Sequence, residues 1–375
     1  MQFLVAWCRR LAADVFTPPF AQPLPSNVET FVAVEPVRKI LWRRIRRSLW
    51  LRLTGQGSLE RSRIDASHRR ILWIHHGMPQ IGDSLMDLAC RVLLRGRGLS
   101  VDLLIDPHLA PLYAADDVFA RVYDDPALAA RNEYDLVIVL SASAQSLRAK
   151  LSHFKRLPYV NLQRFYTGPE FHRTLFGFYR LDQLLGGKAR SEELLAIARP
   201  HMGVSAEVRA AVDALALPPR FIAMVVGGVR GWRTYAHWAA VVAALRAAGA
   251  TEPVLLLGAA NGAAARDAVV ANPRAGVVLD HVDRHSLPEV FEILHRAEVA
   301  VCADGGLLHV AHAAGTPTVA LFAERIQPEY RLTPANRSLA LYSRSEVSDI
   351  APGRVAEAIV AALREGVAGV SITRV

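Results

Sequence analysis

The sequence predicts an α/β fold with two parallel-sheet units in series, behind a basic N-terminal extension. From residue 70 onward, short continuous apolar runs alternate with Ala- and Leu-rich stretches of helical period. This pattern is typical of strands that are covered on both faces of a parallel sheet. The series pauses between residues 163 and 220, around Gly186-Gly187 and Pro218-Pro219, which indicates the change from one unit to the next.

The length and composition agree with two cores of ordinary size, because 52% of the 375 residues are hydrophobic. We therefore expect two Rossmann-like, doubly wound domains, preceded by an extension and followed by a C-terminal helix that is a candidate to pack back on the first domain. The expected boundaries are 1–68 for the extension, 69–210 and 211–350 for the two domains, and 351–375 for the last segment.

Nine apolar runs are the expected strands of the two sheets, and each is followed by a loop or by a stretch of helical period. The expected strands are Ile71–His75, Val101–Ile105, Tyr134–Leu140, Pro158–Leu162, Phe221–Val226, Pro253–Leu257, Val277–Leu279, Val299–Ala303 and Thr318–Phe322.

The positive charge belongs to the extension and is not a property of the fold. Residues 1–70 hold 13 Lys and Arg against 5 Asp and Glu, whereas the rest of the chain is nearly balanced. Residues 17–30 hold four prolines and are predicted to be a linker, and residues 37–53 form an imperfect amphipathic helix. That helix lies on an anionic membrane surface or packs on its own domain, and the pattern leaves both open. Nothing else resembles a nucleic-acid module, so no nucleic-acid partner is expected.

The remaining composition indicates a cytoplasmic protein. No stretch reaches the about 20 apolar residues of a membrane span. Arg9 and Arg10 interrupt the apolar start of the chain, which does not fit a secretory signal. Three cysteines lie far apart without a CxxC pair, as expected of free thiols in a reducing compartment.

The residues after the first expected strand include a candidate general base. Asp83 follows the turn Gly77-Met78-Pro79-Gln80-Ile81-Gly82 and falls near the start of a helix. A carboxylate at that place can take a proton from a hydroxyl, or it can simply favour the helix N-terminus. His75 and His76 end the strand and point to opposite faces, so a metal site is not expected there.

Glycines and arginines follow the fifth expected strand. Gly227 and Gly228 allow backbone N–H groups to approach a phosphate, and Arg230 and Arg233 could clamp a diphosphate. The same pattern also suits an ordinary turn with solvated arginines. After the sixth strand, Asn261-Gly262 suits a base or ribose pocket as well as a plain loop.

The strongest candidate site follows the eighth expected strand. Asp304 comes at the end of that strand, Gly305 and Gly306 expose backbone donors at a helix N-terminus, and Leu307 and His309 follow in its first turn. The N–H groups and the helix dipole can hold phosphate, and the carboxylate can hold sugar hydroxyls. Alternatively, Asp304 caps the helix and His309 is a packed histidine.

Several motifs are absent from the sequence. No DxD stands in a strand-end loop, so no divalent metal is expected on a diphosphate, and no cofactor is expected. G-x-S-x-G, the Walker A motif and G-x-G-x-x-G are also missing, which disfavours hydrolases, P-loop proteins and classical dinucleotide binders.

The order of these pieces resembles a known family. ILWIHHGMPQIGDSLMDL, YDLVIVL, GGVRGWRTYAHW, VLLLGAANG and LPEVFEILHRAEVAVCADGGLLHVAHAAGTPTVALF together resemble the ADP-heptose:lipopolysaccharide heptosyltransferase family, glycosyltransferase family 9. The resemblance covers about residues 70–325 and is most specific at 287–322. It implies the GT-B fold, with an N-terminal acceptor domain and a C-terminal donor domain facing across a cleft.

The resemblance also implies an activity. It is the transfer of a sugar, heptose by resemblance, from a nucleotide-diphosphate donor such as ADP-heptose to a lipopolysaccharide-type glycan. The transfer is expected to invert the anomeric carbon, to need no metal and to take place at the inner face of the inner membrane. Asp83 matches the family's catalytic base, and Asp304, Gly305, Gly306 and His309 match its donor-binding segment. Arg233, with Arg230 as second choice, stands where the family has a lysine for the donor phosphate.

One departure leaves alternatives open. Many members of the family hold the nucleoside with a glutamate where this chain has Asn261-Gly262. The same fold could transfer another sugar to capsule, O-antigen or protein. The chain could also be a catalytically silent nucleotide-sugar-binding protein, whereas a sugar-nucleotide epimerase fits the pattern less well.

Overall fold

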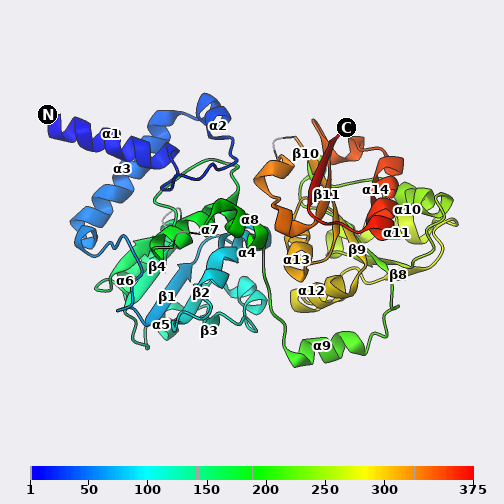
Figure 1. Ribbon diagram of the computed structural model, residues 1–375, viewed down its shortest axis with the longest axis horizontal. Coiled ribbons are helices and arrows are strands. Elements are labelled where there is room, and N and C mark those ends of the chain that lie inside the picture. Colours follow the sequence, from blue (N-terminus) through cyan, green and yellow to red (C-terminus); the bar gives the residue numbers. More distant parts are fainter. Residues whose placement is uncertain (1, 141–142, 188, 325) are drawn as a thin grey trace. The chain divides into compact units, whose positions relative to one another are not determined.

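The computed structural model describes residues 2–140, 143–187, 189–324 and 326–375, and the chain forms two compact units (Figure 1). The N-terminal unit runs up to Pro79 and continues over Asp87–Leu194. The C-terminal unit consists of Gln80–Met86 and Leu195–Val375. The short segment Gln80–Met86, which we expected in the N-terminal domain, therefore makes its contacts with the C-terminal unit.

The N-terminal unit has a parallel five-stranded sheet, and the strand order is β3-β2-β1-β4-β5. Its strands are β1 (Arg70–His75), β2 (Ser100–Ile105), β3 (Phe119–Tyr123), β4 (Leu136–Val139) and β5 (Tyr159–Asn161). Its helices are α1 (Gln2–Phe16), α2 (Val28–Val34), α3 (Val37–Leu53), α5 (Pro126–Ala129), α6 (Ala144–His153) and α7 (Arg173–Leu184). Trp73 in the central strand pairs with Leu103 on one side and Ile138 on the other. Helices α4 (Ile81–Asp87) and α8 (Ser191–Ile197) each contain a boundary between the units.

The C-terminal unit has a parallel seven-stranded sheet in the order β12-β11-β10-β9-β6-β7-β8. Its strands are β6 (Ile222–Val225), β7 (Val254–Leu257), β8 (Val278–Asp280), β9 (Val299–Ala303), β10 (Thr318–Ala323), β11 (Ser338–Ser343) and β12 (Val370–Arg374). Its helices are α9 (Ala206–Asp213), α10 (Trp238–Ala247), α11 (Ala263–Val270), α12 (Leu287–Arg296), α13 (Gly306–Ala314) and α14 (Pro352–Glu365). Since β6 lies between β9 and β7, the loops that follow these three strands meet at one edge of the sheet.

All nine expected strands are present, and the structure adds three that we did not predict. These are β3, β11 and β12. Strands β3 and β12 are edge strands with largely exposed or half-buried side chains, so they lack a continuous apolar run. The sequence of β11 begins and ends with serine, and Ser338 is buried because its hydroxyl lies within hydrogen-bond distance of Thr318 Oγ1 and His312 Nε2.

The basic extension packs on the N-terminal unit through α1 and α3. Ile40 and Leu51 of α3 are buried, and Leu51 joins the core around β1 and β4. Arg44 of α3 forms an ion pair of 3.0 Å with Asp14 of α1. The expectation that the helix over residues 37–53 packs on its own domain is therefore met for one of its faces.

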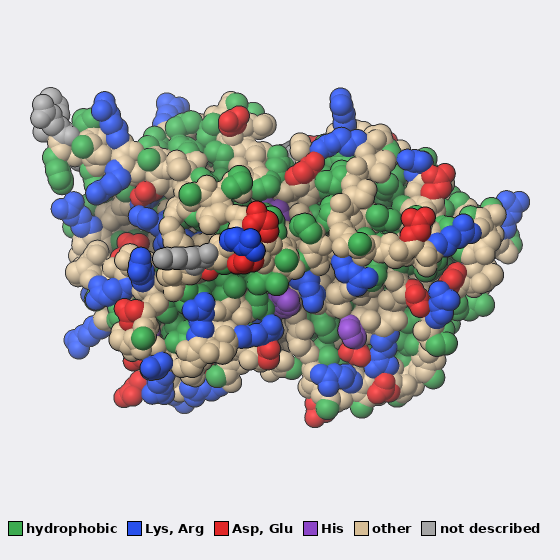
Figure 2. All heavy atoms as spheres, in the orientation of Figure 1, with side chains coloured by type: hydrophobic (Ala, Val, Ile, Leu, Met, Phe, Trp, Pro, Cys, Tyr) green, Lys and Arg blue, Asp and Glu red, His purple; other side chains and the backbone are tan. Residues whose placement is uncertain are grey.

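The opposite face of α3 remains exposed and mixes apolar with basic side chains. Trp42 is 64% exposed and Leu53 is 78% exposed, and at about 100° per residue they share a face with Leu49 and Arg46. Figure 2 shows Lys and Arg side chains beside hydrophobic ones over the part of the molecule where α1 and α3 lie. In the described part of the chain, no helix has the length and apolar character that a membrane span requires.

The proline-rich segment 17–30 differs from the linker that we predicted. Phe20, Leu24 and Val28 pack against a cluster of buried aromatic side chains that contains Phe171 and Phe176. The apolar residues between the prolines find a partner surface, so the segment is fixed to the unit rather than free.

The last segment also differs from its expected packing. Helix α14 packs on α10 and on the sheet of the C-terminal unit, and β12 pairs in parallel with β11. The buried face of α14 carries Val355, Ala356 and Ile359, which belong to the core of that unit. These apolar side chains cover one face of the sheet, and the helix therefore belongs to the C-terminal unit.

The C-terminal core should be sensitive to the loss of side-chain volume. Leu256 of β7 is fully buried in it. We expect Leu256→Ala to lower the free energy of unfolding of this unit by about 2–5 kcal/mol, because the cavity left behind does not collapse. Val277→Ala, at an exposed position just before β8, is the matched control and should have little effect. Urea unfolding monitored for both variants checks this, and equal losses would contradict the packing described.

Candidate functional site

A cavity of about 450 Å³ lies at the carboxyl ends of β6, β7 and β9 in the C-terminal unit. This volume is in the range of small-molecule sites. Its walls come from the loops after these strands, from α12, from the start of α13 and from Ile81 of α4. The predicted donor-binding residues that line it are Gly227, Gly228, Arg233, Asp304, Gly305, Gly306 and Leu307.

The loop after β6 makes a turn that requires glycine at two positions. Gly227 has φ of 90°, and a Cβ added to it would lie 2.9 Å from Gly262 backbone atoms and from Asn261 Oδ1. A Cβ at Gly228 would lie 2.3 Å from the Thr234 hydroxyl oxygen. The Asn261 side-chain amide donates to the Gly228 carbonyl oxygen over 2.9 Å. The loops after β6 and β7 therefore hold each other, and their backbone forms one wall of the cavity.

Arg233 is positioned by an ion pair with Asp304. Its Nη1 donates to Asp304 Oδ2 over 3.0 Å, and its guanidinium lies 5.6 Å from the Trp232 ring centroid. Asp304 is only 5% exposed, and Arg331 Nε lies 3.7 Å from its other oxygen. A buried carboxylate requires such compensation. Asp304 thus holds a cation at the cavity wall, and it ties the loop after β6 to the end of β9.

Helix α13 begins at the cavity. Gly306 is its first residue, and Gly305 precedes it with an extended backbone at φ of 175°. The unpaired N–H groups and the positive end of the helix dipole at this place attract an anion. Together with Arg233, they form a positive wall against which a phosphate group fits.

His309 and Arg230 occupy other places. His309 is buried one turn into α13, and its ring lies against Gly82 of α4, where an added Cβ would be 2.6 Å from the His309 Cδ2 atom. Gly306 is similarly close to Ile81, with 3.3 Å between the Ile81 Cβ and a Cβ built at Gly306. Neither His309 nor the exposed Arg230 lines the cavity. His309 instead packs α13 against α4.

Asp83 lies in the first turn of α4 and is half-buried. It belongs to the segment Gln80–Met86, whose contacts are with the C-terminal unit, and Ile81 of the same turn lines the cavity. Residues i and i+2 of a helix do not share a face. Asp83 accordingly lies beside the cavity and is not part of its wall.

Asp87, one turn later, is a structural residue of the N-terminal unit. Its carboxylate accepts two hydrogen bonds from Arg173, of 2.9 and 3.1 Å, and lies 3.2 Å from His75 Nε2. Burial alone would raise the pKa of Asp87, but Arg173 and His75 outweigh it and hold the pKa below its usual value. Asp87 is thereby ionised and engaged within the N-terminal unit.

Two further polar residues line the cavity, and our sequence analysis did not single them out. Asp283 and His285 follow β8, the neighbour of β7 at the edge of the sheet. Asp283 has φ of 59°, a left-handed conformation that is uncommon outside glycine, and its N–H donates to the Gly258 carbonyl over 2.8 Å. Burial lowers the pKa of His285 and outweighs the nearby charge of Glu289, which would raise it. The sequence signal that could have identified these two residues is the polar run after the seventh expected strand.

The described residues hold no group of three or more His, Cys, Asp or Glu side chains placed to bind a metal ion. The three cysteines are free, and burial raises the pKa of Cys302 to about 12. Cys302 lies in β9. Because of its raised pKa, its thiol is protonated near neutral pH and is a poor nucleophile.

The chain is similar to known proteins over this part. Residues 209–348 match the family model of glycosyltransferase family 9 (heptosyltransferase). A search of curated proteins found no match. Among solved structures, the chain is similar to a glycosyl transferase of family 9 from Veillonella parvula, with 15% identity, a TM-score of 0.65, and 79% of this chain and 98% of that one covered.

Two structures from E. coli are also similar. ADP-heptose lps heptosyltransferase II has 18% identity and a TM-score of 0.61, with 79% of this chain and 99% of that one covered. Heptosyltransferase WaaC with ADP has 15% identity and a TM-score of 0.54, with 80% and 99% covered. At these identities the likeness shows the fold, and the predicted GT-B class of two parallel-sheet α/β domains is confirmed.

The link between α4 and α13 can be tested directly. We expect Gly82→Ala to lower the thermal stability of the C-terminal unit and to weaken ligand binding at the cavity, because the new methyl group would overlap the His309 ring. Gly353→Ala is the matched control, since a Cβ there meets nothing within 4 Å. Thermal unfolding of both variants provides the measurement, and a Gly82→Ala protein as stable as the control would refute the contact.

The match to the family model covers the loops after β6, β7 and β9, the start of α13 and Arg233, which are the parts that form the cavity. Residues 209–348 therefore match glycosyltransferase family 9 over the parts that form the cavity, and the prediction that this chain is a glycosyltransferase is confirmed.

Proposed function

We propose that this protein transfers a sugar, of the heptose class, from a nucleoside-diphosphate donor to an anionic glycolipid of the lipopolysaccharide type. One observation carries the proposal: Arg233, fixed by Asp304, and the N-terminus of α13 line the same cavity. A fixed guanidinium and free backbone N–H groups at one wall are the chemistry that recognises a diphosphate.

The positive groups at the cavity wall indicate where the negatively charged diphosphate of the donor would bind. Its diphosphate lies against Arg233 and the amides of Gly305 and Gly306. The nucleoside extends toward the loops after β7 and β8, where Asn261, Asp283 and His285 provide polar groups. A carboxylate can accept hydrogen bonds from both ribose hydroxyls. Asp283 thus supplies the acid that the loop after β7 lacks.

The proposed reaction is a single displacement that inverts the anomeric carbon. The acceptor hydroxyl oxygen attacks that carbon, the bond to the diphosphate oxygen breaks with its electron pair, and the hydroxyl proton passes to the Asp83 carboxylate. Negative charge grows on the leaving diphosphate, where Arg233 and the α13 dipole are already oriented, so their stabilisation is larger in the transition state than in the ground state. This assignment gives a metal ion no role.

Asp83 should affect transfer more than binding. Asp83→Asn keeps the size of the side chain but cannot take a proton, and we expect about 10²–10⁴-fold slower transfer with nearly unchanged donor affinity. Product formation from a nucleotide sugar and a lipid acceptor measures this, with nucleotide affinity as the second readout. Wild-type turnover in the variant would remove Asp83 from the mechanism, while a wild-type protein that binds donor and forms no product would indicate a silent binding protein.

Arg233 and Arg230 provide a matched pair for the donor site. Arg233→Gln should weaken nucleoside-diphosphate binding by about tenfold or more, because a charge-assisted hydrogen bond to phosphate is lost. Arg230→Gln removes the same charge from an exposed position outside the cavity and should have a much smaller effect. A thermal-shift panel of nucleoside diphosphates reports both affinity and base preference. Equal effects of the two variants would contradict the placement of the diphosphate.

The acceptor is proposed to be reached at an anionic membrane surface, at the inner face of the inner membrane. The exposed face of α3 carries Trp42, Leu49 and Leu53 among Arg38, Lys39 and Arg46. Aromatic and aliphatic side chains beside cations are typical of a helix lying in a membrane interface, where each Lys or Arg adds about 1 kcal/mol. The protein is thus proposed to be cytoplasmic and peripheral to the membrane.

A further inference from the structure

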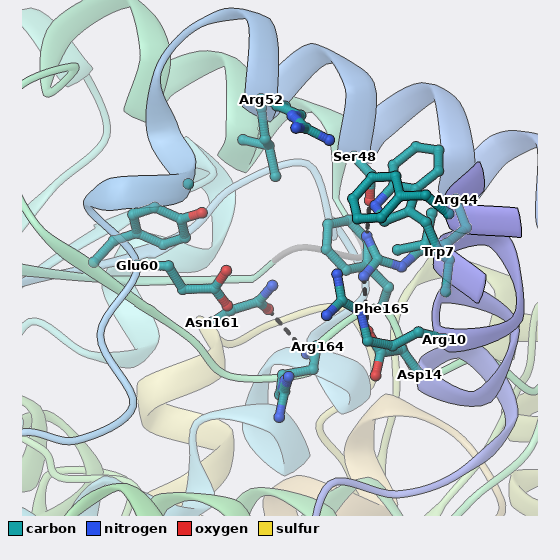
Figure 3. Close-up of a pocket in the computed structure, with 15 residues that line it drawn as sticks. Trp7, Arg10, Asp14, Arg44, Ser48, Arg52, Glu60, Asn161, Arg164 and Phe165 are labelled. Atoms are coloured by element: carbon teal, nitrogen blue, oxygen red, sulfur yellow. Dashed lines mark hydrogen bonds and ion pairs between the residues drawn. The ribbon is translucent and has the colours of Figure 1, made fainter. Parts of the chain in front are cut away.

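A second cavity lies in the N-terminal unit, apart from the candidate donor site. Its volume is about 480 Å³, and it is bordered by α1, α3, the turn around Gly57 and the residues that end and follow β5 (Figure 3). A neighbouring cavity of about 570 Å³ shares the lining residues Gly57, Glu60 and Arg164 with it, so the two adjoin at these residues. We call them together the extension pocket.

The extension pocket carries a large excess of positive charge. Seven arginines line it, against the two carboxylates of Asp14 and Glu60. Asp14 is engaged by Arg44 at 3.0 Å. Within the described residues, Arg10, Arg52 and Arg164 have no carboxylate at ion-pair distance. Figure 3 shows Arg10 on α1, Arg52 on α3 and Arg164 after β5 around the same space.

One of these arginines is buried and has no carboxylate at ion-pair distance among the described residues. Arg180 of α7 is 5% exposed, and its Nη1 and Nη2 donate to the Gln183 side-chain oxygen and the Asn161 carbonyl over 2.6 and 3.2 Å. Both acceptors are neutral, and Arg180 Nε has no partner. Burial and then the nearby charge of Arg164 lower the pKa of Arg180 to about 10. A buried cation of this kind is stabilised when an anion binds next to it.

The backbone that presents Arg164 is unusual. Arg164 and Phe165 are consecutive non-glycine residues in the left-handed region, with φ of 46° and 66°. The Arg164 N–H donates to Asn161 Oδ1 over 2.9 Å, and the Arg44 guanidinium lies 3.8 Å from the Phe165 ring centroid. Strained backbone is concentrated at binding sites, because it persists only where the surroundings enforce it. Here it turns Arg164 toward both cavities.

The other wall of the pocket is apolar. Phe3, Trp7 and Leu11 of α1 line it together with Leu51 of α3. An inorganic ion would leave this wall without a partner, whereas a lipid-linked ligand has both an anionic group and hydrocarbon. The pocket therefore combines arginines for an anion with an apolar wall open at the exposed Phe3.

We propose that the extension pocket binds the phosphate group of a phosphorylated ligand, with the apolar wall favouring a lipid headgroup. Arg10, Arg52, Arg164 and Arg180 meet the phosphate, and α1 covers the adjoining hydrocarbon. This site is formed largely by residues before β1 and does not depend on the sugar-transfer reaction proposed above.

The test compares the full-length protein with two triple variants. Arg10→Gln/Arg52→Gln/Arg164→Asn removes three exposed guanidiniums from the pocket, and asparagine tolerates the left-handed backbone at position 164. Arg131→Gln/Arg148→Gln/Arg156→Gln removes the same charge from exposed positions of the same unit that do not line the pocket. The probes are glycerol 3-phosphate in solution and phosphatidylcholine vesicles that contain phosphatidic acid. Circular dichroism and thermal unfolding confirm that the variants are folded.

We expect the pocket variant to bind the vesicles about tenfold or more weakly than wild type, and the control variant to change little. Loss of vesicle binding alone identifies a lipid headgroup, and loss of glycerol 3-phosphate binding as well identifies phosphate itself as the determinant; either result supports the pocket. Equal weakening in both triple variants would show diffuse attraction between charges and overturn the proposal. A wild-type protein that binds neither probe would also overturn it.

Discussion

The ion pair between Arg233 and Asp304 is the constraint on which the candidate donor site depends. It joins the loop after β6 to the end of β9 over 3.0 Å, and it keeps a cation at the wall of the cavity beside the N-terminus of α13. The carboxylate is 5% exposed and has arginines on both of its oxygens, so its charge serves to orient these groups. The sequence left open whether Asp304 holds sugar hydroxyls or caps α13. Its ionic contacts are with Arg233 and Arg331, and we propose that it positions Arg233 for a diphosphate.

The second constraint is the packing of α4 on α13. Gly82 makes room for the His309 ring, and Gly306 lies close to Ile81, so the first turn of α4 belongs to the C-terminal unit. The proposed base Asp83 is thereby carried beside the donor cavity by a segment that follows β1 of the other unit. Proximity of this kind lowers a barrier by arranging groups before the reaction. His309 contributes through its shape rather than as part of the cavity wall.

Much of the fold could be predicted because buried parallel strands are continuous apolar runs. Strands β3 and β12 were not predicted because edge strands keep polar residues. Strand β11 was not predicted because it begins with a serine, Ser338, whose hydroxyl is hydrogen-bonded to Thr318 inside the sheet. At the site, the glycines and Arg233 could be recognised from their places after strands. Asp283 and His285 could have been found from the polar run after β8, whereas Arg331 could not, because its contact with Asp304 depends on the sheet order.

The most direct test of the central claim is hydrogen–deuterium exchange of the full-length protein with and without a nucleoside diphosphate that binds it. A ligand that lies against the strand ends slows exchange of the amides it contacts or orders. The account predicts slower exchange in three segments, namely residues 226–234, 258–262 and 303–307, with little change along β3 or β12. Protection confined to other segments, or none at a saturating concentration, would contradict the assignment of this cavity as the donor site.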